Sequence, residues 1–317
     1  MLVHLFALLV ACSTAILIFA GGLVTSTESG LSVPDWPNTY GRFMFFFPIE
    51  KMVGGIFYEH SHRLIASTVG FLILVQAIVL WRFEARQWVR RLGFLALAAV
   101  ITQGLLGGIT VLWYLPRPIS IAHASLAQIV FCLAVTIAVA TSPGWNRSYT
   151  TSGRSREQDP PYPLRRLALV TTAVIYVQIV IGATMRHNDA GLAIPDFPLM
   201  FGGLLPPQWN FPIAIHFAHR VGAVIVTLTI LLTTAGVFRQ AWDRRELRTP
   251  ALVLLLLVAV QITLGALTVL SQKHYIINSL HVVTGGTVLI TSLVLTLRLH
   301  RSRFDRSGDG RLVGQAA

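Results

Sequence analysis

The stretch Glu59-His60-Ser61-His62-Arg63 stands at the start of the apolar segment 62–81 and sets the interpretation of the whole chain. A related stretch, His216-Phe217-Ala218-His219-Arg220, stands near the start of the apolar segment 213–238. A histidine in a segment long enough to cross a membrane is costly and usually functional. The same His-Arg pair near the start of two such segments indicates two copies of one structural plan.

The composition indicates an integral membrane protein. Of 317 residues, 54% are hydrophobic and only 12% are charged, which is roughly half the charged fraction of soluble domains. A helix needs about 20 apolar residues to cross a bilayer, and lipid offers its backbone no water to bond, so spanning segments must be helical. We expect eight such helices, at residues 2–24, 62–81, 92–113, 119–140, 166–185, 213–238, 250–270 and 277–297. The first lacks a basic leader and a clear cleavage site, so we interpret it as a retained helix.

The net charge of +12 follows from the expected topology and requires no nucleic-acid partner. With eight crossings, most arginines fall on one side of the membrane, in segments 82–91, 141–166, 239–249 and 298–311. The opposite side keeps few basic residues: Arg42, Lys51, Arg117, Arg186 and Lys273. The positive-inside rule therefore predicts that both termini lie in the cytoplasm.

An internal repeat organises the chain. Gly30-Leu31-Ser32-Val33-Pro34-Asp35-Trp36-Pro37 returns as Gly191-Leu192-Ala193-Ile194-Pro195-Asp196-Phe197-Pro198. Gln103-Gly104-Leu105-Leu106-Gly107 likewise returns as Gln261-Ile262-Thr263-Leu264-Gly265. Each copy holds four helices, and an even number makes the copies parallel, related by an axis along the membrane normal.

We therefore expect an all-α membrane fold of two tandem four-helix bundles in a parallel pseudo-two-fold repeat. The expected parts are an N-terminal unit 1–141, a cytoplasmic linker 142–165, a C-terminal unit 166–298 and a basic cytoplasmic tail 299–317. The proline-containing elements fall in the two longest external loops, 25–61 and 186–212. Proline blocks helix continuation, so these loops are structured turns. They act either as a cap on each bundle or as a lid over a site, and repetition does not choose between the two.

Four histidines occupy matching positions near the start of alternate apolar segments: His62, His123, His219 and His281. With eight crossings they lie at similar depth near the external face, and each unit contributes two. Two imidazoles from different helices of one bundle can bind a heme iron from opposite sides. We predict two heme sites, one formed by His62 and His123 and the other by His219 and His281. Nearby glycines, such as Gly107 and Gly265, serve either close helix packing or admission of a macrocycle.

The two halves differ beside these histidines. Glu59 lies one helical turn before His62, on the same helix face, whereas His216 takes this place before His219. A carboxylate beside a heme can move protons, so we predict a reactive site in the first half and an electron-transfer site in the second. The alternative is that Glu59 is solvated at the membrane edge.

Arg63 and Arg220 directly follow their histidines and are candidate partners for heme propionates. The alternative is that each extends to the outer lipid headgroups. The two cysteines, Cys12 and Cys132, lie inside predicted helices, where we interpret them as small apolar residues and expect no disulfide. The chain has no zinc-binding cysteine spacing.

Taken together, these features resemble the heme A synthase family over nearly the whole chain: eight helices in two units, paired Pro-Asp loops, Glu59-x-x-His62-Arg63 and the four spaced histidines. The resemblance implies an enzyme that oxidises a methyl group of heme O to a formyl group through an alcohol intermediate. It implies that His62 and His123 face the substrate heme, that His219 and His281 hold a heme b cofactor, and that Glu59 fills the family's acidic, catalytic position.

The same resemblance implies a multi-pass protein of a bacterial cell membrane that supplies heme A to terminal oxidases. Its expected partners are heme O synthase as the source of substrate, terminal-oxidase assembly factors and an unidentified electron partner. Many family members carry cysteines where this chain has Val33 and Ile194. A thiol or disulfide role at these positions therefore cannot operate here.

Two other functions fit part of the pattern. A di-heme b-type cytochrome that passes electrons from quinol without altering its heme fits the four histidines equally well, but has less need of Glu59 in one half only. A transporter built from parallel repeats explains the repeat but not the paired histidines. For the synthase, two axial histidines saturate the iron. Either one ligand leaves during turnover or oxidation proceeds at the porphyrin edge, and the sequence does not decide.

Overall fold

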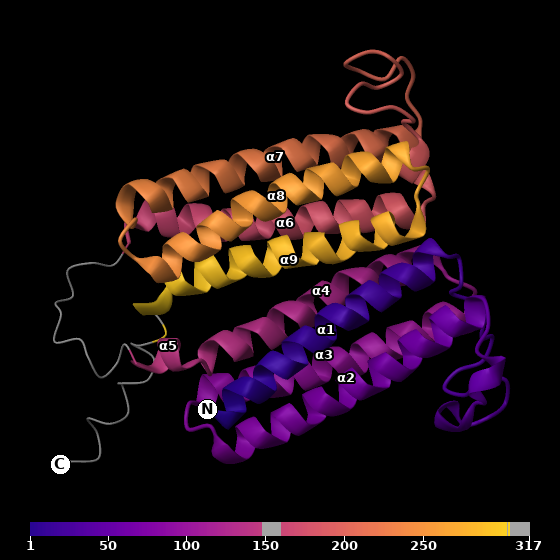
Figure 1. Cartoon of the computed structure of the whole chain (residues 1–317), viewed down its shortest axis with the longest axis horizontal. Helices are drawn as coiled ribbons and strands as arrows, with labels where there is room; N and C mark the ends of the chain where they lie inside the picture. Colours follow the sequence, from indigo (N-terminus) through magenta and orange to yellow (C-terminus); the bar gives the residue numbers. More distant parts are fainter. Residues whose placement is uncertain (148–159, 303, 305–317) are drawn as a thin grey trace.

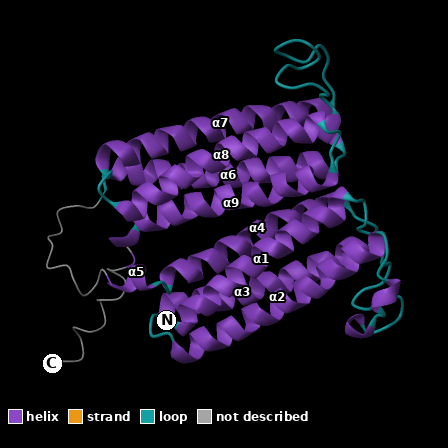
Figure 2. Cartoon of the chain, in the orientation of Figure 1, coloured by secondary structure: helices purple, strands orange, loops and turns teal. Residues whose placement is uncertain are grey.

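The computed structural model describes residues 1–147, 160–302 and 304, and long helices make up most of it (Figures 1 and 2). The long helices are α1 (Leu2–Ser26), α2 (Gly55–Phe83), α3 (Gln87–Leu112), α4 (Arg117–Ala140), α6 (Tyr162–His187), α7 (Phe211–Gln240), α8 (Arg245–Leu270) and α9 (Tyr275–Leu299). Among the described residues, these eight are long and apolar enough to cross a membrane. The predicted all-helical membrane class is confirmed.

The helices pack in two groups of four. Helices α1 to α4 contact one another, as do helices α6 to α9, and α1 and α4 of the first group contact α9 and α6 of the second. Figure 1 shows the two groups lying side by side, with the two long loops at one end of the helices and the N-terminus at the other. Each group has its own buried apolar cluster, centred on residues such as Ile73 and Ile137 in the first and Ile230 and Leu254 in the second.

Several helices begin earlier than the apolar segments predict. The largest difference is in α2, which begins at Gly55 and not at residue 62. Its first turns contain Glu59 and Arg63, which are almost fully buried and satisfied by polar partners. A hydropathy pattern detects only the apolar part of a helix, whereas backbone bonding continues wherever polar side chains find partners. As a result His62 lies about two turns inside its helix.

The expected linker 142–165 is partly helical. Pro143–Arg147 form the short helix α5, and Tyr162 already belongs to α6. The contacts of Trp145 hold α5 against the segment that follows α9. Trp145 is 5% exposed, stacks under the Arg301 guanidinium at 5.3 Å and contacts the Phe304 ring. Residues 148–159 of this linker lie outside the described residues, as do residue 303 and residues 305–317 of the predicted basic tail.

A polar cluster joins the two groups near the loop-bearing end. Arg186, at the end of α6, donates hydrogen bonds to the Gly22 carbonyl at 2.9 Å and to the Ser26 hydroxyl at 2.8 Å, both in α1. Ser26 also accepts from Asn278 and contacts the hydroxyl of Ser279 in α9. Apolar burial gives little driving force between helices in lipid, so such hydrogen bonds carry much of the association.

Replacing the arginine of this cluster tests its contribution. We expect Arg186→Met to lower the free energy of unfolding by about 1–3 kcal/mol, because it removes two hydrogen bonds from a charged donor. Thermal unfolding in detergent measures the loss. Arg117→Met, at an exposed position at the start of α4, is the matched control. An equal loss in both variants would contradict this role.

Candidate heme-binding sites

Each of the four predicted ligands rests on a glycine of the preceding long helix. A Cβ added at the glycine would lie 2.8–3.2 Å from Cε1 of the histidine ring, tighter than ordinary van der Waals contact. The four pairs are Gly21 with His62, Gly107 with His123, Gly182 with His219 and Gly265 with His281. The missing side chain lets the Cε1 corner of the imidazole approach the neighbouring helix, so a histidine fits between two closely packed helices.

The two histidines of the second unit lie close together. The ring centroids of His219 and His281 are 6.4 Å apart. Imidazole nitrogens bind a transition metal at about 2.0 Å, so two imidazoles on opposite sides of one ion have centroids roughly 6 Å apart. The observed separation fits a shared iron between His219 and His281.

The residues around the rings also fit a bound heme. The Nδ1 atoms of His62, His123 and His281 are buried without a hydrogen-bond partner in the described part of the chain. Buried polar atoms normally have partners, so these nitrogens indicate that a bound group completes the site. Among the described residues, no three His, Cys, Asp or Glu side chains cluster to hold a metal ion. A heme iron needs only two protein ligands because the porphyrin supplies the others.

Sequence reasoning missed a glutamine beside three of the four histidines. The Gln178 amide donates to Nδ1 of His219 at 3.0 Å, and that of Gln103 to Nε2 of His123 at 3.3 Å. Gln261 approaches Nε2 of His281 at 3.5 Å. Each glutamine stands four residues before the glycine that supports the same histidine. The spacing was visible in the repeated Gln-x-x-x-Gly motif, but nothing in the sequence indicated which side chain it faces.

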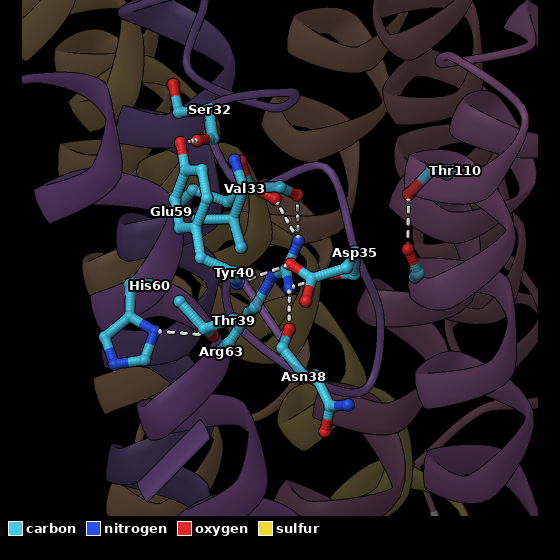
Figure 3. A network of polar contacts seen from close by, with 11 residues as sticks. Ser32, Val33, Asp35, Asn38, Thr39, Tyr40, Glu59, His60, Arg63 and Thr110 are labelled. Atoms are coloured by element: carbon cyan, nitrogen blue, oxygen red, sulfur yellow. Dashed lines mark hydrogen bonds and ion pairs between the residues drawn. The ribbon is translucent and has the colours of Figure 1, made fainter. Parts of the chain in front are cut away.

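The first proline-containing loop is fastened to α2 by buried polar contacts (Figure 3). Oε2 of Glu59 accepts a hydrogen bond from the Val33 N–H at 2.8 Å, and Oε1 pairs with the Arg63 guanidinium. Arg63 in turn donates to three loop carbonyls, those of Val33, Asp35 and Asn38. These contacts fix the loop over the end of the first helix group.

The second loop repeats this design with one change. Arg220 donates to the carbonyls of Ile194, Asp196 and Leu199. His216 replaces Glu59: its Nδ1 faces the Ile194 N–H at 3.2 Å and its Nε2 faces Nε of Arg220 at 3.3 Å. A neutral imidazole has one acceptor nitrogen, whereas a carboxylate accepts both contacts at once. The first loop is therefore held more firmly than the second.

These contacts bear on alternatives that the sequence left open. The guanidinium groups of Arg63 and Arg220 bind loop carbonyls, and their role as propionate partners stays a prediction. Glu59 is 3% exposed, so it is not solvated at the membrane edge. Its carboxylate contacts the loop and Arg63, and no hydrogen bond joins it to His62 within the described residues. The carboxylate instead satisfies the Val33 N–H and the charge of Arg63.

His60 also has a structural role that its sequence position did not reveal. It is 1% exposed, contacts the Thr39 hydroxyl at 3.1 Å through Nδ1 and packs on the Phe47 ring. The first loop therefore covers His60. Cys12 and Cys132 are unpaired and lie in α1 and α4, within the membrane-spanning part.

Trp36 extends the first loop toward the histidine sites. A Cβ at Gly108 would lie 2.6 Å from the indole of Trp36, so the indole rests directly on α3. Gly108 is adjacent to Gly107, which supports His123. In the second unit Phe197 and Ala266 occupy the corresponding positions, and the Phe197 ring lies 5.8 Å from the Arg220 guanidinium. An indole thus packs next to the supporting glycine in the first unit, where the second unit has Phe197 and Ala266 at these positions.

An aspartate stabilises the turn of each loop. Asp35 accepts hydrogen bonds from the Tyr40 and Gly41 N–H groups, both at 2.8 Å, and Asp196 accepts equivalent bonds from Phe201 and Gly202. Partial burial acts to raise the pKa of Asp35, but these N–H groups and the Arg63 charge lower it overall. The Gly202 and Phe201 N–H groups lower the pKa of Asp196.

The fold and the sites define a class: a multi-pass helical membrane protein with paired, glycine-supported histidines near two fastened loops. Residues 4–294 match the family COX15-CtaA, described as cytochrome oxidase assembly protein. The chain belongs to this family.

Individual relatives agree over most of their length. The chain is 30% identical over 300 residues to a protein named "Heme A synthase" from Symbiobacterium thermophilum, covering 91% of this chain and 94% of the relative. A protein of the same name from Halalkalibacterium halodurans is 25% identical over 306 residues, 94% of this chain and 97% of the relative. A third, from Staphylococcus haemolyticus, is 28% identical over 271 residues, 82% and 83% of the two chains.

The glycine supports give a direct test of the histidine sites. We expect Gly182→Ala to displace the His219 ring, because the new Cβ would lie 2.8 Å from Cε1. Heme retention at that site should fall roughly tenfold or more, as it does when groups that orient a metal ligand are lost. The optical spectrum of the purified protein measures bound heme per chain. Gly104→Ala, where a Cβ meets nothing within 4 Å, should leave heme content unchanged, and equal content in both variants would contradict the prediction.

The aspartate of the first loop gives a second test. We expect Asp35→Ala to raise hydrogen exchange at the Tyr40 and Gly41 amides at least about tenfold, because two bonds to a charged acceptor are lost. Because the folded pKa lies below the unfolded value of 3.8, this stabilisation is complete above pH 3.8 and is lost as the pH falls through the folded value. Glu50→Gln, an exposed position in the same loop, is the control. Unchanged exchange in Asp35→Ala would refute the proposed turn.

Proposed function

We propose that this chain is a heme A synthase, an oxidoreductase that converts a methyl group of heme O to the formyl group of heme A. The observation that carries the proposal is an acidic difference between two sites with the same paired, glycine-supported histidines. Glu59 and Arg63 stand beside the first histidine pair, and His216 and Arg220 beside the second. The relatives named "Heme A synthase" support this function over nearly the full chain.

The two units take different hemes in this proposal. The N-terminal unit, residues 1–141, would bind substrate heme O between His62 and His123. The C-terminal unit, residues 166–298, would hold heme b between His219 and His281. The 6.4 Å separation of the His219 and His281 rings supports an iron between them. When bound, heme b supplies a one-electron redox centre next to the substrate site.

Glu59 has two tasks in this account. It anchors the first loop through the Val33 N–H, and it lies three residues before His62 on the same helix face. We assign its carboxylate the role of accepting, at Oε1, protons released as the methyl group is oxidised. Arg63 positions this oxygen and holds its charge until a proton arrives. The Trp36 indole rests on α3 beside Gly107, which supports His123.

The arrangement in the membrane belongs to the same proposal. We place the protein in a bacterial cell membrane with both termini in the cytoplasm and the two units as a parallel repeat. The matching loop contacts of Asp35 and Asp196 and the glycine supports support the repeat. The arginine-rich turns at the end opposite these loops support the orientation. The proposed partners are heme O synthase, terminal-oxidase assembly factors and an electron partner.

Conversion of heme O tests the function. Expressed in bacteria that make heme O but not heme A, the chain should produce a formyl heme, which pyridine hemochrome spectra identify. We expect Glu59→Gln to lower this production roughly 100-fold, the scale of a lost proton-transfer group, while heme binding persists. Glu50→Gln is the control for a lost carboxylate. Full turnover in Glu59→Gln with intact heme content would contradict the catalytic role.

A di-heme b-type cytochrome gives a different result in the same assay. The wild-type chain would then bind heme and produce no formyl heme, even with heme O supplied. His219→Ala and His281→Ala separate the sites, because each should lose the low-spin heme signal of the second unit only. Retention of that signal in both variants would refute the ligand assignment.

A further inference from the structure

One of the four histidines, His62, lacks the glutamine that contacts each of the other three. Three of the helices that face a histidine carry the motif Gln-x-x-x-Gly: Gln103 to Gly107, Gln178 to Gly182 and Gln261 to Gly265. The fourth, α1, carries Leu17-x-x-x-Gly21 and faces His62. Leu17 therefore stands where Gln178 stands in the second unit, one turn before the supporting glycine.

A second substitution accompanies the first. In the second unit Gly222, three residues after His219, leaves the space that the Gln178 amide occupies, since a Cβ there would lie 2.0 Å from Oε1. The corresponding residue, three after His62, is Ile65. Leu17 and Ile65 both pack against the apolar cluster of the first unit. The first unit thus has two apolar side chains at the positions of Gln178 and Gly222. Ile65 stands where Gly222 leaves room for the glutamine amide.

The hydrogen bonds reflect this difference. Oε1 is buried without a partner in all three glutamines among the described residues. When one ring nitrogen of a histidine binds iron, the other carries a proton and needs an acceptor. Rotating the neighbouring glutamine amide by half a turn would present its Oε1 as that acceptor. Nδ1 is buried with no partner in the described chain in His62, His123 and His281 alike. The rings of His123 and His281, however, contact a glutamine through Nε2, whereas Leu17 offers His62 no polar group. Groups that accept this proton hold the imidazole in place and increase its basicity.

We propose that His62 is the weakly held axial ligand of the substrate heme and detaches from the iron, while Gln103 keeps His123 bound. The inference rests on the proposed function, which assigns the first histidine pair to the substrate. It makes Gln103, Gln178 and Gln261 positioning residues, and makes Leu17 with Ile65 the feature that opens one coordination position in the first site. The second site stays closed because both of its histidines have a glutamine.

Carbon monoxide binding to the reduced protein tests the proposal, because carbon monoxide binds ferrous heme only where an axial position is free. The protein is purified with its bound hemes from cells that supply heme O. We expect carbon monoxide to bind the heme of the first unit and not that of the second. The double variant Leu17→Gln/Ile65→Gly gives the first unit the glutamine and glycine of the second. It should weaken carbon monoxide binding to the heme of the first unit about tenfold or more.

The reverse exchange gives an independent arm. Gln178→Leu should make the heme of the second unit bind carbon monoxide, whereas Gln178→Glu keeps an acceptor oxygen and should not. If the double variant does not fold, these two single variants decide. Carbon monoxide binding that is unchanged in Leu17→Gln/Ile65→Gly, or absent in Gln178→Leu, would overturn the inference.

The outcome is separable from that of the proposed function. Carbon monoxide binding reports ligand release whether or not heme O is converted. A chain that makes no formyl heme but shows the expected binding pattern would refute the synthase and retain the weakly held His62. A chain that makes formyl heme without that pattern would retain the synthase and refute the role of Leu17.

Discussion

An imidazole fits between two closely packed membrane helices only where the facing helix has no side chain, and the rest of this structure depends on that constraint. Gly21, Gly107, Gly182 and Gly265 meet it once for each histidine. Each glycine lies on the helix that precedes the histidine's own helix, so consecutive antiparallel helices form one half of a site. Two such pairs make up each group of four contacting helices, as the predicted repeat requires.

The loops add a second level of organisation to the helix pairs. Their carbonyl groups accept hydrogen bonds from Arg63 and Arg220. These bonds offset the cost of placing a guanidinium group in an apolar region. The anchor of the first loop is a carboxylate and that of the second is an imidazole. One substitution thereby changes the strength of the loop attachment and the chemistry available beside the nearest histidine.

The number of spans, the repeat of the loop motif and the histidine positions could be predicted because they depend on composition and spacing alone. The early start of α2 could not be predicted, because Glu59 and Arg63 are polar. Their burial is favourable only with the hydrogen bonds that the loop supplies. The predicted helix places Glu59 three residues before His62, but the sequence could not show that the carboxylate accepts from the Val33 N–H, because that contact is made in the tertiary structure. The role of Gln178 was missed for a similar reason, since periodicity does not identify which helix a side chain faces.

The central claim is that the chain holds two unlike hemes in two matching units. Extraction and chromatography of the pigments from the purified protein test it most directly. The account predicts one heme b per chain together with heme O, heme A or the hydroxylated intermediate. Two molecules of heme b per chain, with no modified heme, would contradict it.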